Sequence, residues 1–261
     1  MFEPVLVGSV RPSPRVRIDF DSVPLGTVRA DVFVSYARVV ALVRDGLQVF
    51  AAGGFTLTDF EPPLGIPVSY HAEVFDSSGA SLGVTGSSTV VVWGELGYGW
   101  FSDPLNPSSA VEVPLGGDFG VALERSTPMQ RHVVSGRTVF LAGSRGLLEG
   151  IDLFAKTDTL AQADKLRDVL AQPFLLVRTH PRSLLPPLLY VALSQTAEVD
   201  ADVQWGGERI DWPLVGDEMT RTNTPVAVPA VSYQTYMNAY PTYADAVYVT
   251  YLDAMKNPPE A

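Results

Sequence analysis

Short runs in which apolar and polar residues alternate, each ended by turn-forming residues, dominate the first half of the chain. Successive side chains of a β-strand point to opposite faces, so such alternation predicts half-buried strands. About seven short strands in roughly 90 residues are typical of a β-sandwich, and we predict one for residues 1–102. The expected strands are Arg15 to Phe20, Asp31 to Tyr36, Leu42 to Phe50, Phe55 to Phe60, Val68 to Phe75 and Thr89 to Trp93.

Two turns are expected within this half. Asp45-Gly46 interrupts the run from Leu42 to Phe50, and an Asp-Gly pair between apolar residues is a strong β-hairpin signal. Asp76-Ser77-Ser78-Gly79 follows the run ending at Phe75 and is rich in turn formers.

The length of 261 residues indicates two domains. Pro, Gly and Ser are concentrated between positions 103 and 120, as in a domain connection, so we predict a linker at 103–120 and a second domain at 121–230.

The second half mixes strands with one helix. Thr159 as N-cap and Gln162 three residues later form a capping-box pattern, which predicts a helix over 159–171. Ala163, Leu166, Val169 and Leu170 share one face of that helix and should pack on a sheet. Strands are expected at Val133 to Ala142, Gly150 to Ala155, Phe174 to Arg178 and Leu188 to Ser194.

Gly206-Gly207 predicts a two-residue hairpin turn in which Trp205 pairs with Glu208. Counting outward from this turn places Trp205 and Trp212 on one apolar face, where both indoles should be buried. Asp200, Asp202 and Asp211 fall on the other face, with Asp202 opposite Asp211. Like charges in that position repel, so we expect a solvated or Arg-paired face; a calcium site at these three aspartates is the alternative.

The last segment, 231–261, carries three Thr-Tyr-x-Asn/Asp-Ala units that begin at Thr235, Thr242 and Thr250. A Thr cap followed by Asn or Asp suits a first helical turn, so a short helical tail is expected. Its tyrosines combine apolar area with a hydroxyl and are the candidate interface: Tyr233, Tyr236, Tyr240, Tyr243, Tyr248 and Tyr251.

Composition and charge exclude several classes of function. With 18 Lys and Arg against 29 Asp and Glu, the net charge of −11 argues against nucleic acid as a partner. The absence of Cys excludes disulfides and thiol chemistry. No run of about 18 apolar residues suggests a membrane span, and the segment Met1-Phe2-Glu3-Pro4 has no signal-peptide pattern, so synthesis in a cytoplasm is expected.

No catalytic, cofactor-binding or metal-binding motif stands out, and we expect no enzyme activity. His71, His132 and His180 lack metal-ligand spacing. Ser144 lies in Gly143-Ser144-Arg145-Gly146, which does not match the spacing of a nucleophile elbow, and a plain turn is the simpler interpretation. No glycine-rich phosphate loop occurs.

Several motifs together resemble a known family. The stretch from Asp59 to Asp76, containing Glu61-Pro62-Pro63-Leu64-Gly65, together with Asp103-Pro104-Leu105-Asn106-Pro107, is similar to the fibronectin type III-like module of minor tail proteins from long-tailed phages of high-GC Gram-positive bacteria. The helix from Thr159 and Arg209-Ile210-Asp211-Trp212-Pro213-Leu214 resemble the split-barrel domain of that family and of distal tail proteins. The Thr-Tyr repeats resemble its C-terminal tail.

This resemblance implies a mainly β chain: a fibronectin type III-like β-sandwich, then a split β-barrel with one packed helix and a short helical tail. It implies a virion protein at the tail tip or baseplate, joining the tail tube to the hub or receptor-binding apparatus. It also implies a ring of copies around the tail axis and contacts with other tail proteins such as tube, hub and tape measure. Because the chain is poor in charge and its tail is rich in Tyr, we expect three or six copies in that ring. Neither nucleic acid, membrane nor cofactor is implied.

Two other classes of function remain open. A host-surface adhesin would bind glycan through exposed aromatic platforms near Trp93 and Trp100. An enzyme with unrecognised residues would need a pocket lined by perturbed carboxylates.

Overall fold

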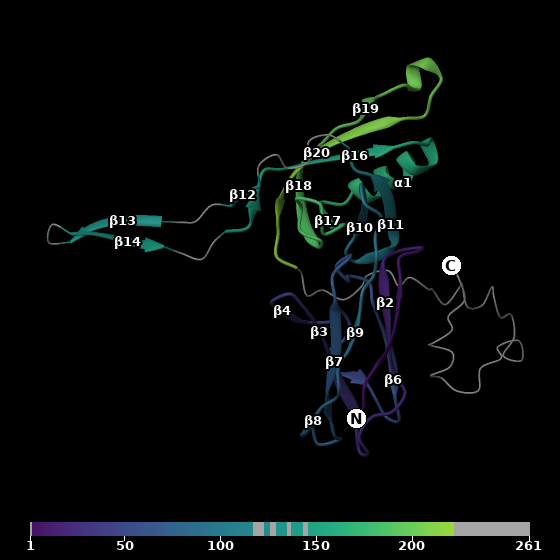
Figure 1. The fold of residues 1–261 in the computed structure, drawn as a ribbon, viewed down its shortest axis with the longest axis vertical. Helices are drawn as coiled ribbons and strands as arrows, with labels where there is room; N and C mark the ends of the chain where they lie inside the picture. Colours follow the sequence, from purple (N-terminus) through teal and green to yellow (C-terminus); the bar gives the residue numbers. More distant parts are fainter. Residues whose placement is uncertain (1, 117–122, 126–128, 135–136, 143–145, 222–261) are drawn as a thin grey trace, which may run out of the picture. The chain divides into compact units, whose positions relative to one another are not determined.

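The computed structural model describes residues 2–116, 123–125, 129–134, 137–142 and 146–221 (Figure 1). These residues form two compact units. The first unit comprises residues 2–94 and Ser102–Ala110, and the second comprises Glu95–Phe101 and residues 111–221. The chain is mainly β, as predicted, with several antiparallel sheets, one of them curled into a half-barrel, and a single α-helix in the described part.

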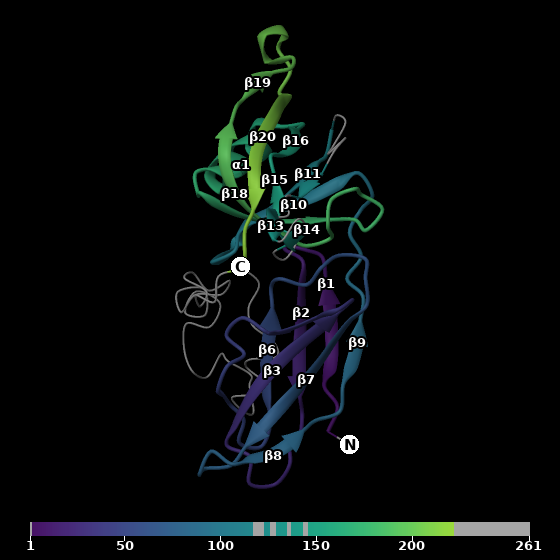
Figure 2. The same ribbon diagram turned by 90° about the vertical axis from the view of Figure 1, so that its left-hand side faces the viewer.

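The first unit contains two sheets (Figure 2). The smaller has the order β1–β2–β6, with β1 at Val5–Ser9, β2 at Arg15–Phe20 and β6 at Phe55–Asp59. The larger has the order β4–β3–β7–β8, with β5 also on β3 and β9 also on β7; its strands are β3 (Arg29–Tyr36), β4 (Val39–Leu42), β5 (Val49–Phe50), β7 (Val68–Phe75), β8 (Ser81–Val84) and β9 (Ser88–Val90).

Alternation determines which face of each strand is buried. In β7 every second residue is buried, from Val68 to Val74, while the residues between them are partly exposed. The predicted bounds of β2 and β7 are confirmed. A buried hydrogen bond joins the two sheets, because the Tyr70 hydroxyl on β7 donates to Asp59 Oδ2 on β6 at 2.8 Å.

The predicted hairpin at Asp45-Gly46 is wrong. Strands β4 and β5 do not pair with each other; both pair with β3, one after the other. The residues between them bond back to the same strand, since Val32 N donates to Gly46 O at 2.8 Å and Gln48 N donates to Asp31 Oδ1 at 2.7 Å. These bonds to β3 replace the bonds that a hairpin would have made.

The turn expected at residues 76–79 is confirmed. Asp76 Oδ1 accepts hydrogen bonds from Ser78 N and Ala80 N, each at 2.9 Å, and Gly79 N donates to Asp76 O. The Ser78 hydroxyl also donates to Asp76 Oδ1, at 2.7 Å, and this bond, followed by that from Ala80 N, lowers the pKa of Asp76.

A curled sheet of seven strands dominates the second unit. Its order is β11–β10–β17–β18–β20–β16, with β19 also on β20. Leu115 pairs with Ala155 of β16, and Gly116 N donates to Phe154 O at 2.9 Å, so the segment after β11 reaches the last strand of the order. The bounds are β10 (Tyr98–Asp103), β11 (Asn106–Pro114), β16 (Ile151–Thr157), β17 (Phe174–Thr179), β18 (Leu189–Thr196), β19 (Val199–Asp200) and β20 (Ile210–Glu218).

Helix α1, Leu160–Leu170, covers this core as predicted. Thr159 is its N-cap, with Oγ1 accepting from Gln162 N at 3.2 Å. Its buried residues, Ala163, Leu166 and Val169, belong to the same apolar cluster as Trp212, Leu153 and Leu175. No helix of the described residues is long and apolar enough to cross a membrane.

Part of the predicted linker at 103–120 is a strand. Val111 and Val113 of β11 are buried, and their alternation with polar neighbours suits an outer strand of the curled sheet. Pro107 and Pro114 fit there because β11 ends the strand order, so one of its edges needs no backbone N–H donor.

Two further two-stranded ladders complete the described residues. Strand β12 (Glu124–Arg125) pairs with β15 (Leu148–Glu149), and β13 (Met129–Val134) pairs with β14 (Arg137–Ala142). The single strand predicted at Val133 to Ala142 is therefore two strands. The tail 231–261 and its six tyrosines, as well as Ser144, lie outside the described residues.

Candidate interaction surfaces

The predicted hairpin register at Gly206-Gly207 is wrong. Val199 pairs with Asp211 and Asp200 pairs with Ile210, so residues 201–209 form a longer connection between β19 and β20. This connection contains a 3₁₀ turn, η1, at Val203–Trp205. Trp205 is 82% exposed instead of buried, whereas Trp212 is 1% exposed and lies in the core as predicted.

Aspartate side chains explain the changed register. Asp200 accepts hydrogen bonds from Val203 N at 2.6 Å and from Gln204 N at 3.1 Å, as a capping residue does. Asp202 Oδ1 accepts from Arg209 N at 2.8 Å, and its carbonyl accepts from Gly207 N. These bonds satisfy backbone donors that the two-residue hairpin would have used in its ladder.

The three aspartates are not brought together as a set. Asp211 lies opposite Val199 instead of Asp202, and its Oδ1 is buried with no hydrogen-bond partner. The side chains of Asp200 and Asp202 instead accept hydrogen bonds from backbone amides of the connection between β19 and β20. The described residues contain no group of three or more acidic, His or Cys side chains arranged for a metal ion.

The three histidines lie on different elements. His71 stacks on Phe33 in the larger sheet of the first unit, with ring centroids 5.5 Å apart. His132 is exposed on β13, and His180 Nδ1 accepts from Arg182 N in the turn after β17. No catalytic arrangement of these side chains follows from their positions.

An exposed apolar and acidic surface surrounds Trp205. We define the tip as Asp158, Leu160 and residues 199–209. Leu160 N donates to Glu208 Oε2 at 3.3 Å, so the start of α1 and the β19–β20 connection lie side by side. The exposed apolar side chains are Leu160, Val199, Val203 and Trp205, and the charges are Asp158, Asp200, Asp202 and Glu208 against Arg209.

The hairpin of β13 and β14 is a second unusual element (Figure 1). Within the described residues its strands pair only with each other. A two-stranded hairpin is at best marginally stable alone in water. Its sequence contains Arg131, His132 and Arg137 but no acidic residue, in a chain with a net charge of −11, and Arg131 and His132 are exposed.

The first unit has an apolar edge on its larger sheet. Strands β4 and β5 border β3, and exposed apolar side chains lie along this edge at Val39, Val40, Leu47 and Phe50. Of the tryptophans proposed as glycan platforms, Trp93 is 64% exposed, while Trp100 is 3% exposed and therefore unavailable.

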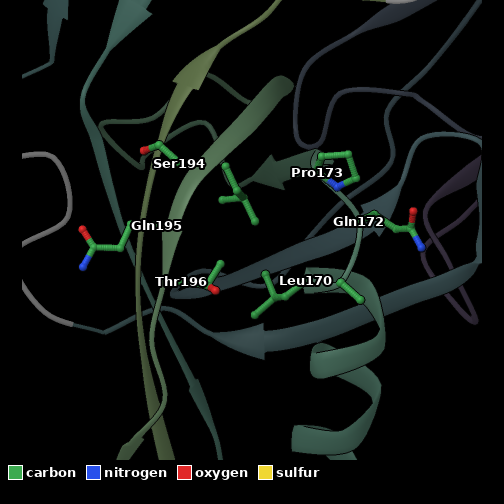
Figure 3. Close-up of a pocket in the computed structure, with 8 residues that line it drawn as sticks. Leu170, Gln172, Pro173, Ser194, Gln195 and Thr196 are labelled. Carbon is green, nitrogen blue, oxygen red and sulfur yellow. The ribbon is translucent and has the colours of Figure 1, made fainter.

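One shallow hollow of about 230 Å³ lies between the end of α1 and β18 (Figure 3). Leu170, Pro173 and Leu193 form its apolar wall, and Gln172, Ser194 and Thr196 contribute polar groups. No charged side chain lines it. The hollow therefore offers no carboxylate, imidazole or amine for acid–base chemistry, and extended surfaces remain the stronger candidate sites.

No protein-family model matches the chain, and no curated protein or solved structure is significantly similar to it. The candidate surfaces consequently rest on this chain's own residues. The tip has a signal in the sequence: Asp200, shortly before Val203-Gln204-Trp205, is a capping residue type that competes with the glycine turn.

Proposed function

We propose that this chain is a structural component of the tail tip or baseplate of a long-tailed phage. In this role it joins the tail tube to the hub or receptor-binding apparatus and works by self-association and protein docking. Its first unit would be a fibronectin type III-like β-sandwich and its second a split β-barrel. The proposal assigns no catalytic residue, cofactor, nucleic acid or membrane to the chain.

The observation that carries the proposal is the isolated hairpin of β13 and β14. Its strands have no other strand partner among the described residues, and two strands alone gain too little burial to be stable in water. A partner surface would supply the missing contacts. The exposed Trp205 and the apolar edge at Val40 and Phe50 also suit protein docking, because large apolar side chains are enriched in interface centres.

The oligomeric state and the place in the particle test this proposal. The purified chain should have the mass of a ring of three or six subunits when measured by light scattering, and labelled antibodies should mark the tail tip in electron micrographs of the particle. Labelling of the head or of the tail shaft would contradict the proposal.

One observation favours a second candidate, a glycan-binding adhesin. Trp93 presents an exposed indole, and sugars stack on such rings. A glycan array with the wild-type chain and with Trp93→Ala tests this function. Binding that disappears in Trp93→Ala would favour the adhesin, whereas equal signals from the two proteins would contradict it.

A further inference from the structure

We propose that the Tyr-rich tail, residues 231–261, docks on the outer face of the β1–β2–β6 sheet of its own chain. This contact goes beyond the proposed function and does not depend on it. The tail lies outside the described residues, and the reasons for the contact lie in the sheet.

The register of the strands defines the outer face of this sheet. Val16, Ile18 and Phe20 of β2 are 0% exposed and belong to the core of the first unit. Successive side chains of a strand point to opposite faces, so the residues that alternate with these three point outward together with their cross-strand partners. The outward residues are Arg15, Arg17 and Asp19 on β2, Val7 on β1, and Thr56 and Thr58 on β6.

Two polar residues of the outer face are buried where solvent is expected. Asp19 is 3% exposed, and its cross-strand partner Thr56 is 5% exposed. The Thr56 hydroxyl donates to Asp19 Oδ1, and Arg17 Nε donates to Asp19 Oδ2 at 3.0 Å. These bonds pair the carboxylate but do not enclose Thr56, because β6 is the last strand of the sheet and has a neighbouring strand on one side only.

No described strand or helix accounts for this burial. An antiparallel sheet of a two-layer sandwich usually has one face on the core and the other in water. Figure 1 shows β2 and β6 as the outer layer of the first unit, with no described strand or helix of that unit beyond them. We assign the cover over Asp19 and Thr56 to the chain that continues after Arg221.

Charge favours this face for the tail. Residues 231–261 contain three acids against Lys256, which gives a net charge of −2. The outer face of the β1–β2–β6 sheet has two arginines against Asp19, a net charge of +1. The outward residues of β3 and β7 on the larger sheet have Asp31 and Glu73 against Arg29, a net charge of −1. Complementary charge therefore selects the smaller sheet and disfavours the larger one.

The tyrosines of the tail also find suitable contacts on this face. Val7 is 44% exposed and offers apolar area to a phenol ring. Arg15 and Arg17 are partly exposed, and guanidinium groups stack on aromatic rings. A segment with six tyrosines can therefore cover the face without burying an unpaired charge.

Photo-cross-linking in the full-length chain tests the contact. The chain has no cysteine, so a single introduced thiol is the only site that a maleimide benzophenone labels. Thr58→Cys places this label on the outer face of the smaller sheet, and Val40→Cys, the matched control, places it on the larger sheet. After irradiation, trypsin cleavage at Arg221 and Lys256 releases residues 222–256, which contain all six tyrosines.

Mass spectrometry should find this tail peptide joined to the Thr58→Cys peptide, with a yield several-fold above that from Val40→Cys. On a denaturing gel the product should keep the mass of one chain, because the tail belongs to the same chain. Reversing the tail charges with Asp245→Arg and Asp253→Arg should lower the yield from Thr58→Cys several-fold. Should Thr58→Cys fail to fold, Val7→Cys places the label on the same face.

Three results would overturn the proposal. The first is that neither Thr58→Cys nor Val7→Cys captures the tail peptide. The second is an equal yield from Val40→Cys, which would show that the tail contacts the two sheets without preference. The third is a product with the mass of two chains, which would assign the tail on this face to a second copy.

Discussion

Single residues show how strongly burial constrains polar chemistry in the first unit. Arg44 and Glu61 are both largely buried, with Arg44 Nε donating to Glu61 Oε1 at 2.8 Å. Near them, burial and the Asp59 carboxylate raise the pKa of Tyr70, so its hydroxyl stays protonated and donates to Asp59. These groups need partners because a buried charge or hydroxyl without one is costly.

We expect Glu61→Leu to lower the free energy of unfolding of the first unit by about 3–5 kcal/mol, because it leaves the Arg44 charge buried without its carboxylate. The double variant Arg44→Met with Glu61→Leu should recover much of that loss, since no unpaired charge remains. Urea unfolding followed by circular dichroism measures both. A double variant less stable than Glu61→Leu would contradict this account.

Among the secondary-structure elements, local sequence signals predict where an element forms but not which other element it pairs with. The helix α1 begins at its predicted cap, and its buried face is the predicted one. By contrast, Val49 and Phe50 of β5 are typical strand residues, but no pattern in the neighbouring sequence predicts that they pair with β3. In β11, residues that alternate between buried and exposed lie among prolines and serines, and for that reason the sequence predicted a linker there.

The cap of α1 gives a prediction at this scale. Thr159→Ala removes the oxygen that accepts from Gln162 N and should destabilise the second unit by about 1 kcal/mol. Asp168→Ala, on the exposed face near the C-terminal end, should be neutral or slightly stabilising, because an acid there opposes the helix dipole. Thermal unfolding of the two variants measures the difference, and equal stabilities would argue against the cap.

At the scale of the molecule, the described residues contain two buried cores, one in each compact unit. The seven-stranded sheet, α1 and Trp212 share one of them. Trp212 also donates from Nε1 to Thr157 Oγ1 at 3.0 Å, so its indole is both packed and hydrogen-bonded. A unit with its own core can unfold by itself.

Differential scanning calorimetry of the full chain should therefore resolve two transitions. Trp212→Ala should lower the stability of the second unit by about 3–5 kcal/mol and shift only one transition. Glu61→Leu should shift only the other. If both variants shift one common transition, the two units unfold together and this prediction is wrong.

By itself, the sequence determined the elements whose signals are local. Period-two burial defined β2 and β7, and the Thr159 cap with its apolar stripe defined α1, since these features depend on neighbours within a few residues. It also identified Trp212 as a core residue.

Only the tertiary structure decided which strands pair and which side chains remain exposed. Trp205 and Trp212 have equal apolar character, yet the Asp200 side chain binds the backbone amide of Val203 before Gly206, the Asp202 side chain binds that of Arg209 after it, and Trp205 is left exposed. Likewise, β4 and β5 lie on β3 because the bonds to that strand replace those of a local hairpin. Register and partner depend on hydrogen bonds between distant residues, and local composition does not encode which of several competing bonds is made.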